Sequence, residues 1–205
     1  MPESTHSGRR ICLFGGTFDP VHFAHLRVAQ EALKQCHLNG IVFIPAGVPP
    51  HKAVGRVTPY EDRLHMVEIA CAPYPEFEVS RLEEGTRRSY TIETVERFRK
   101  MLSPADELFF LIGADAFNEI ESWHRWQDLI QLIEFIVVTR PGGCYKVPPG
   151  AQVQKLNGLE LPISSSAIRA RLAARKPTPE LPDGVRAFIE ERGLYLKKRK
   201  TTVLR

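Results

Sequence analysis

The sequence lacks the features that mark membrane-spanning and secreted proteins. Its 205 residues contain no uninterrupted apolar run near the ~18 to 20 residues that a membrane-spanning helix needs. The first ten residues, MPESTHSGRR, are polar and have no apolar core after their charges, so they do not match a signal peptide. We therefore expect a cytoplasmic protein without a membrane partner.

Cysteine is also scarce. The chain has four cysteines, and no two of them form a C-x-x-C pair. This spacing excludes a disulfide framework and argues against zinc, so we expect reduced, mostly buried thiols and no metal site made by the protein alone. The cysteines are Cys12, Cys36, Cys71 and Cys144.

The charge balance is mildly positive, with a formal net charge of +4. Part of the excess lies in the terminal run LKKRK, Leu196 to Lys200. A short basic tail is usually a solvated chain end, and no aromatics are interleaved with this one, so we expect no nucleic-acid partner. A small positive excess suits a small anionic ligand. The composition leaves the oligomeric state open, a homo-oligomer included.

Short apolar runs alternate with longer amphipathic ones, which is typical of an α/β protein with a doubly wound parallel sheet and both faces covered. The expected strands are Ile11–Phe14, Ile41–Gly47, Phe77–Ser80, Glu107–Gly113 and Phe135–Gly142. The expected helices are Val21–His37, a segment after Thr58, Thr91–Leu102, a Trp-rich stretch, a helix that Ser164 caps, and a last helix that ends at Gly193. The segment after Thr58 starts with a capping box, in which Thr58 is the N-cap, Pro59 the first helical residue and Glu61 the third. We expect Arg140–Gln152 to be a loop.

No linker or repeat divides the chain, and its length suits one domain. We therefore predict a single domain over residues 1–205, with an N-terminal tail at 1–9 and the basic tail at 197–205. Ligands of such folds bind at the carboxyl ends of the strands, beside helix N-termini. The unusual segments GGTFDPVH, PAGVPPHK, GADAF and TRPGG all fall there.

The segment GGTFDPVHFAHL, Gly15 to Leu26, follows the first strand and leads into a helix. It is neither a G-x-G-x-x-G fingerprint nor a phosphate-binding P-loop. Glycines still allow close backbone approach, and a helix start offers N–H groups and a positive dipole to a phosphate. His22 and His25 are three residues apart, so they share one helix face. Each alone is ordinary surface polarity; together in this context they favour phosphate contact.

Several separated motifs now identify a resemblance: FGGTFDPVHFAHL, PPHK, RRSYTIET, GADAF, SWHRW, RPG, SSSAIR and the closing GLY. The sequence resembles the nucleotidylyltransferase superfamily with its Rossmann-like fold and H-x-G-H motif, and within it the bacterial nicotinate-nucleotide adenylyltransferases. The resemblance runs from about Cys12 to Tyr195. Ala24 replaces the usual Gly of H-x-G-H, and Ser166 a frequent Thr, from which we expect small effects.

The resemblance implies transfer of AMP from ATP to nicotinate mononucleotide, with release of pyrophosphate. The attacking phosphate oxygen is already anionic, so no general base is needed, and catalysis rests on positioning and charge stabilisation. The implied catalytic residues are His22, His25, Lys52 and Arg169. Mg²⁺ is expected, bound mainly by ATP phosphates and water.

The resemblance also implies two binding sets. Residues for ATP are Gly15, Gly16, Thr17, Phe18, His22, His25, Lys52, Gly113, Asp115, Arg140, Ile163, Ser164, Ser165, Ile168 and Arg169, with the two isoleucines near the adenine. Residues for nicotinate mononucleotide are Gly16, Thr17, Tyr90, Thr91, Asp115, Trp123 and His124, with Trp123 stacked on the pyridine ring.

Simpler interpretations remain for several of these residues. Lys52 and Arg140 suit loop surfaces equally well, His51 has no assigned role, and Asp115 is also a candidate N-cap. Trp126 and Arg171 are expected to be a core residue and a solvated neighbour. Arg169 near a helix N-terminus opposes the dipole, which is easier to understand if an anion binds between them.

Three alternatives to this activity are considered. The same chemistry with nicotinamide mononucleotide differs only by an amide in place of a carboxylate. A pantetheine-phosphate adenylyltransferase shares the histidine motif, but that family is shorter and lacks the Trp and SYT pattern. A catalytically inactive nucleotide sensor is suggested by Ala24.

Overall fold

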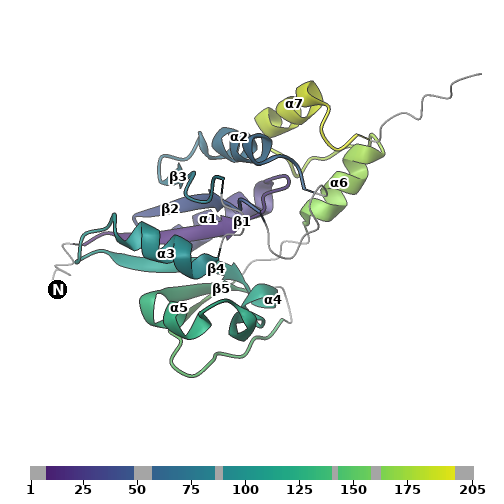
Figure 1. Cartoon of the computed structure of the whole chain (residues 1–205). Helices are drawn as coiled ribbons and strands as arrows, with labels where there is room; N and C mark the ends of the chain where they lie inside the picture. Colours follow the sequence, from purple (N-terminus) through teal and green to yellow (C-terminus); the bar gives the residue numbers. More distant parts are fainter. Residues whose placement is uncertain (1–7, 49–56, 86–89, 140–142, 158–162, 197–205) are drawn as a thin grey trace, which may run out of the picture.

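The computed structural model describes residues 8–48, 57–85, 90–139, 143–157 and 163–196 (Figure 1). Six strands form one sheet in the order β3-β2-β1-β4-β5-β6, and every neighbouring pair is parallel. The predicted parallel α/β fold is confirmed. The strands are β1 (Arg10–Gly16), β2 (Gly40–Pro45), β3 (Phe77–Val79), β4 (Glu107–Gly113), β5 (Glu134–Val138) and β6 (Val153–Leu156).

Helices cover both faces of the sheet. In Figure 1, α2 and α7 lie on one side, and α3, α4 and α5 on the other. The helices are α1 (Phe23–Gln35), α2 (Tyr60–Cys71), α3 (Thr91–Arg99), α4 (Ala114–Phe117), the 3-10 helix η1 (Ile120–Ser122), α5 (Trp126–Leu132), α6 (Ser165–Ala173) and α7 (Asp183–Arg192). None of the helices in the described ranges has the length and apolar character that a bilayer crossing requires.

The strands read as continuous apolar runs because each face of the sheet has its own core. Side chains alternate between the faces along a strand. Cys12 of β1 packs in the cluster that includes α1, α2, α6 and α7, whereas the next residue, Leu13, packs in the cluster with α3, α4 and α5. Phe109 and Phe110 of β4 divide in the same way.

Two sequence expectations about the elements were wrong. Helix α2 begins at Tyr60, so Pro59 and not Thr58 is its N-cap, and the carbonyl of Thr58 instead accepts from the Arg63 guanidinium. Strand β6, Val153–Leu156, was not predicted. Only Leu156 of its four residues is fully buried, because β6 is an edge strand, and this left too weak an apolar pattern to recognise.

The strand order reverses between β1 and β4. From β1 the chain moves to β2 and β3 on one side, then returns to β4 beside β1 and continues to β5 and β6. At such a switch point the connecting loops leave in opposite directions and open a crevice at the carboxyl ends of the strands. Here those ends are Gly16 and Gly113.

Candidate active site

The turn after β1 is built tightly around its glycines. A methyl group on Gly16 would lie 2.9 Å from the Phe18 ring, and one on Gly15 would lie 3.2 Å from the Phe110 ring. Phe18 is buried and has a positive φ of 49°, which is rare for an aromatic residue. Side chains larger than glycine therefore do not fit well at these two positions, because aromatic rings pack directly against the backbone there.

The two histidines lie at the start of α1, one turn further on. His22 is the N-cap residue, with an extended backbone, so the helix starts at Phe23 and not at Val21 as expected. The two rings stack with centroids 3.8 Å apart, which confirms that they share one face. The His22 backbone N–H donates to Nδ1 of His25 at 3.2 Å. In the neutral ring the proton of His25 must then be on Nε2.

Burial keeps both imidazoles neutral. It lowers the pKa of His22 to about 4, against a smaller opposing effect of Glu180. It also lowers the pKa of His25 well below its ordinary value, and the neighbouring His22 adds to this effect. At neutral pH the pair therefore offers N–H donors rather than fixed positive charges.

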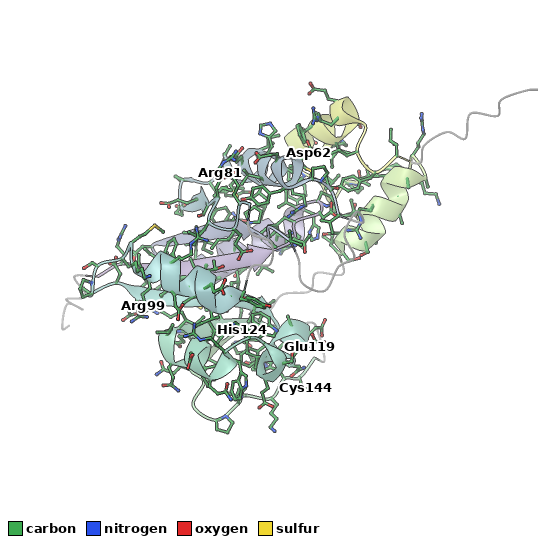
Figure 2. The ribbon with its side chains drawn as sticks, viewed as in Figure 1. Asp62, Arg81, Arg99, Glu119, His124 and Cys144 are labelled. Atoms are coloured by element: carbon green, nitrogen blue, oxygen red, sulfur yellow. The ribbon has the colours of Figure 1, made fainter. Side chains whose placement is uncertain are left out.

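A cavity of about 410 Å³ opens beside the glycine turn. It brings together eight residues predicted for the nucleotide sites: Gly15, Gly16, Thr17, Tyr90, Thr91, Gly113, Trp123 and His124. Trp123 packs edge-on against Phe110, which also lines the cavity. Tyr90 is the N-cap of α3 and its ring lies 4.5 Å from that of His124, which Figure 2 labels.

Helix α6 contacts the Asp19–Pro20 turn, which lies between the glycine turn and α1. Ser164 caps α6 by accepting from the Ala167 N–H, as the serine run predicted. Ser165 donates its hydroxyl to the Pro20 carbonyl at 3.0 Å, and Arg169 donates to the Asp19 carbonyl at 2.7 Å. The α6 N-terminus is thus fixed next to the glycine turn, where the sequence placed a triphosphate site.

Two sequence expectations are corrected here. The N-cap of α4 is Gly113, and Asp115 lies within the first turn instead. Arg171 is not a solvated side chain: it is half-buried and forms an ion pair with Glu180. Of the two isoleucines expected near the adenine, Ile168 is fully buried in the core and Ile163 is half-buried.

The predicted residues Lys52 and Arg140, and His51 next to Lys52, lie outside the described residues.

Arg63 of α2 is a site residue that the sequence analysis missed. It is 1% exposed, and its guanidinium donates to three carbonyls, those of Thr58, Thr17 and Gly47. Thr17 follows the glycine turn and Gly47 follows β2, so Arg63 joins the two loops beside the cavity. Arg63 lies on the same face of α2 as the buried residues Val67 and Ala70. A charged residue on an otherwise apolar helix face was the sequence pattern that could have indicated its burial.

Two buried carboxylates were also missed. Asp19 is 2% exposed and its Oδ1 accepts from the Tyr195 hydroxyl at 2.7 Å. Glu83 lines the cavity, and its Oε1 accepts from the Thr94 hydroxyl at 2.7 Å. Nothing in the local run RLEEG distinguishes Glu83 from Glu84, because only tertiary packing turns one of them inward.

This geometry defines a class of protein: a Rossmann-like α/β protein with a glycine turn after β1, a histidine pair at a helix start and a cavity at the switch point. The cytidylyltransferase-like family profile matches residues 13–171. A probable nicotinate-nucleotide adenylyltransferase of Solibacter usitatus is 50% identical over 91% of this chain and 99% of its own length. One from Geobacillus thermodenitrificans is 43% identical over 91% of this chain and 86% of its own.

A solved structure agrees on the fold. Plasmodium falciparum nicotinic acid mononucleotide adenylyltransferase, complexed with NaAD, superposes with a TM-score of 0.77 at 21% identity, covering 91% of this chain and 97% of that one. The chain therefore belongs to the cytidylyltransferase-like family of nucleotidyltransferases. Within it, the chain is a member of the nicotinate-nucleotide adenylyltransferase family.

Proposed function

We propose that the protein transfers AMP from ATP to nicotinate mononucleotide, giving nicotinate adenine dinucleotide and pyrophosphate. A phosphate oxygen of the mononucleotide attacks the α-phosphorus of ATP, and the bond from that phosphorus to the α,β-bridging oxygen breaks. The observation that carries the proposal is the cavity that joins the glycine turn to Trp123, Tyr90 and Thr91. Its volume falls in the range of ~300 to 1,000 Å³ found for small-molecule sites.

The cavity suits the pyridine end of the substrate. Trp123 offers an aromatic wall, and the N-terminus of α3 at Tyr90 and Thr91 presents backbone N–H groups that lack helical acceptors. A carboxylate on the ring is favoured by such donors and by the helix dipole, whereas an amide gains less from either. This contrast supports nicotinate over nicotinamide.

The histidine pair suits the phosphate being transferred. His25, with its proton on Nε2, is a neutral donor whose hydrogen bond strengthens as negative charge builds on the phosphate oxygens. Arg169, held at the start of α6, and Lys52 supply positive charge to the triphosphate. No residue needs to remove a proton, because the attacking oxygen is already charged.

Mg²⁺ enters with ATP as part of the substrate. Within the described ranges, no three His, Cys, Asp or Glu side chains are grouped in a way that could hold a metal ion. This donor set fits a cation carried by phosphates and water rather than one caged by the protein. When bound, Mg²⁺ would neutralise charge on the leaving pyrophosphate.

The test is pyrophosphate release from ATP and Mg²⁺ with either nicotinate or nicotinamide mononucleotide. We expect release with both and a higher kcat/KM for the acid. Trp123→Ala should raise KM for the mononucleotide more than for ATP. Trp126→Phe is the matched control, because Trp126 packs against the core and does not line the cavity. ATP binding in calorimetry without turnover of either mononucleotide would instead identify a sensor.

A further inference from the structure

Five buried polar side-chain atoms have no hydrogen-bond partner among the described residues: Oδ2 of Asp19, Nδ1 of His22, the hydroxyl of Tyr60, Nε of Arg171 and Oε2 of Glu180. A buried polar atom without a partner costs about 1 to 3 kcal/mol, so such atoms are uncommon and need an explanation. Nδ1 of His22 and Oε2 of Glu180 belong to segments that a backbone hydrogen bond joins. Nδ1 can carry a proton and Oε2 can accept one, so the two atoms are complementary.

A backbone hydrogen bond ties the Glu180 segment to the start of α1, and an ion pair to α6 holds its carboxylate. It lies between α6 and α7, and its backbone carbonyl accepts from the N–H of Phe23 at 2.9 Å. Phe23 directly follows His22, so this bond ties the Glu180 segment to the start of α1. Arg171 of α6 holds the other carboxylate oxygen, Oε1, in an ion pair that is about one-third exposed at the Arg171 side chain and 20% exposed at Glu180. Arg171 uses only one terminal nitrogen for this contact, and neither its Nε nor Oε2 of Glu180 has a hydrogen-bond partner among the described residues.

The electrostatics agree with this proximity. Burial dominates and lowers the pKa of His22, but the Glu180 carboxylate acts in the opposite direction. Burial by itself would raise the pKa of Glu180, but the hydrogen bond from Arg171 lowers it, and His22 adds a smaller effect in the same direction. The other charged or titratable groups near this region are His25 from α1, Arg169 and Arg171 from α6, Asp19 from the turn before α1, and Tyr195, whose hydroxyl donates to Asp19. Of the two carboxylates, Glu180 is the one whose charge raises the pKa of His22.

We propose that Glu180 is a positioning residue for His22: when an anionic nucleotide phosphate binds, the ring takes up a proton and becomes a cation whose Nδ1–H donates to Oε2 of Glu180. The proton comes from solvent on binding and returns to solvent when pyrophosphate leaves. His22 then differs from His25, which stays a neutral donor. The effect of this role on catalysis rests on the proposed function. Proton uptake on nucleotide binding does not, because it can be measured without turnover.

The test compares wild type with Glu180→Gln, which keeps the shape and an oxygen for Arg171 but removes the charge. The first readout is the His22 pKa in the free protein, from NMR titration of ring signals that disappear in His22→Gln. We expect this pKa to fall by about 0.5 or more in Glu180→Gln. The second readout is proton uptake on MgATP binding, from calorimetry at pH 7 in two buffers of different ionisation enthalpy. We expect wild type to take up more protons than Glu180→Gln.

Kinetics supply the third readout. We expect Glu180→Gln to lower kcat by about 10-fold or more, with a smaller change in KM for ATP, because charge on His22 matters most in the transition state. Glu180→Asp keeps the charge and should restore part of the proton uptake. Glu190→Gln, on the exposed side of α7, is the control and should match wild type.

The outcomes are distinct. An unchanged His22 pKa and unchanged proton uptake in a folded Glu180→Gln protein would overturn the proposal, whatever the enzyme's activity. If Glu180→Gln does not fold, proton uptake on MgATP binding by wild type and His22→Gln decides: equal uptake by these two proteins would show that His22 does not take up the proton and would overturn the proposal. Wild type without pyrophosphate release would refute the proposed function and leave the binding readouts to judge Glu180.

Discussion

The backbone N–H of His22 donates to Nδ1 of His25, and this single contact determines what His25 can do. With Nδ1 occupied as an acceptor, the neutral ring carries its proton on Nε2. The donor that we propose for the phosphate is thus set before any substrate binds, so no reorganisation of this ring is needed during the proposed reaction.

His25→Ala tests this donor. We expect kcat to fall by at least ~10²-fold, typical of losing a transition-state donor, while KM for either substrate changes much less. Steady-state pyrophosphate release gives both constants. A near-wild-type kcat would mean that His25 is not a donor to the reacting phosphate.

The neutral state of His22 makes folding stability depend on pH. The pKa of His22 is about 4 in the folded chain, against about 6.5 when unfolded, so the unfolded chain binds the proton more tightly. Its contribution is therefore complete above about pH 6.5 and is lost as the pH falls toward 4. We expect His22 to account for about 2 kcal/mol of lost stability between pH 7.5 and 5. Urea unfolding at both pH values should show this loss reduced in His22→Gln; an equal loss in both proteins would contradict it.

Arg63→Lys tests the guanidinium that joins the loops. Lysine keeps the charge but cannot reach three carbonyls in different directions, so buried acceptors lose their partners. We expect a loss of about 2 to 4 kcal/mol in the free energy of unfolding and a lower kcat, because the Thr17 carbonyl beside the glycine turn is released. Arg27→Lys, on the exposed face of α1, should change neither, and equal behaviour of the two variants would argue against the role of Arg63.

A pair of glycine variants separates folding from binding. Gly16→Ala places a methyl group 2.9 Å from the Phe18 ring, so we expect a stability loss of about 1 to 3 kcal/mol. A methyl group on Gly113 meets nothing within 4 Å, but Gly113 lines the cavity. We expect Gly113→Ala to fold normally and to raise KM for a nucleotide substrate several-fold. Thermal unfolding and kinetics on both variants check the contrast.

Ala24→Gly tests the residue between the histidines. Ala24 is 6% exposed and lies in the first turn of α1, where alanine is a better helix former than glycine. We expect the variant to lose about 0.5 to 1 kcal/mol of stability and to keep kcat within about twofold. A much faster variant would show that the methyl group hinders the phosphate site.

Much of the site followed from the sequence because its parts are local. Gly15 and Gly16, the histidine pair, the Ser164 cap and the Gly193 helix end each depend on a few neighbouring residues, and the structure contains them where the motifs placed them. The same holds for strands such as β4, where an unbroken apolar run predicts burial on both faces.

The rest depended on contacts between distant segments. Arg63 and Thr17, Phe23 and Glu180, and Tyr195 and Asp19 are far apart in the sequence, and they meet because the fold brings α2 and the segments flanking α7 to the β1–α1 turn and the start of α1. No local pattern encodes which charged side chain is turned inward, since that choice depends on which buried acceptors remain to be satisfied. The sequence by itself thus determined the fold class and the position of the glycine turn, whereas tertiary packing decided the burial of the two histidines, which keeps them neutral, and the residues that surround them.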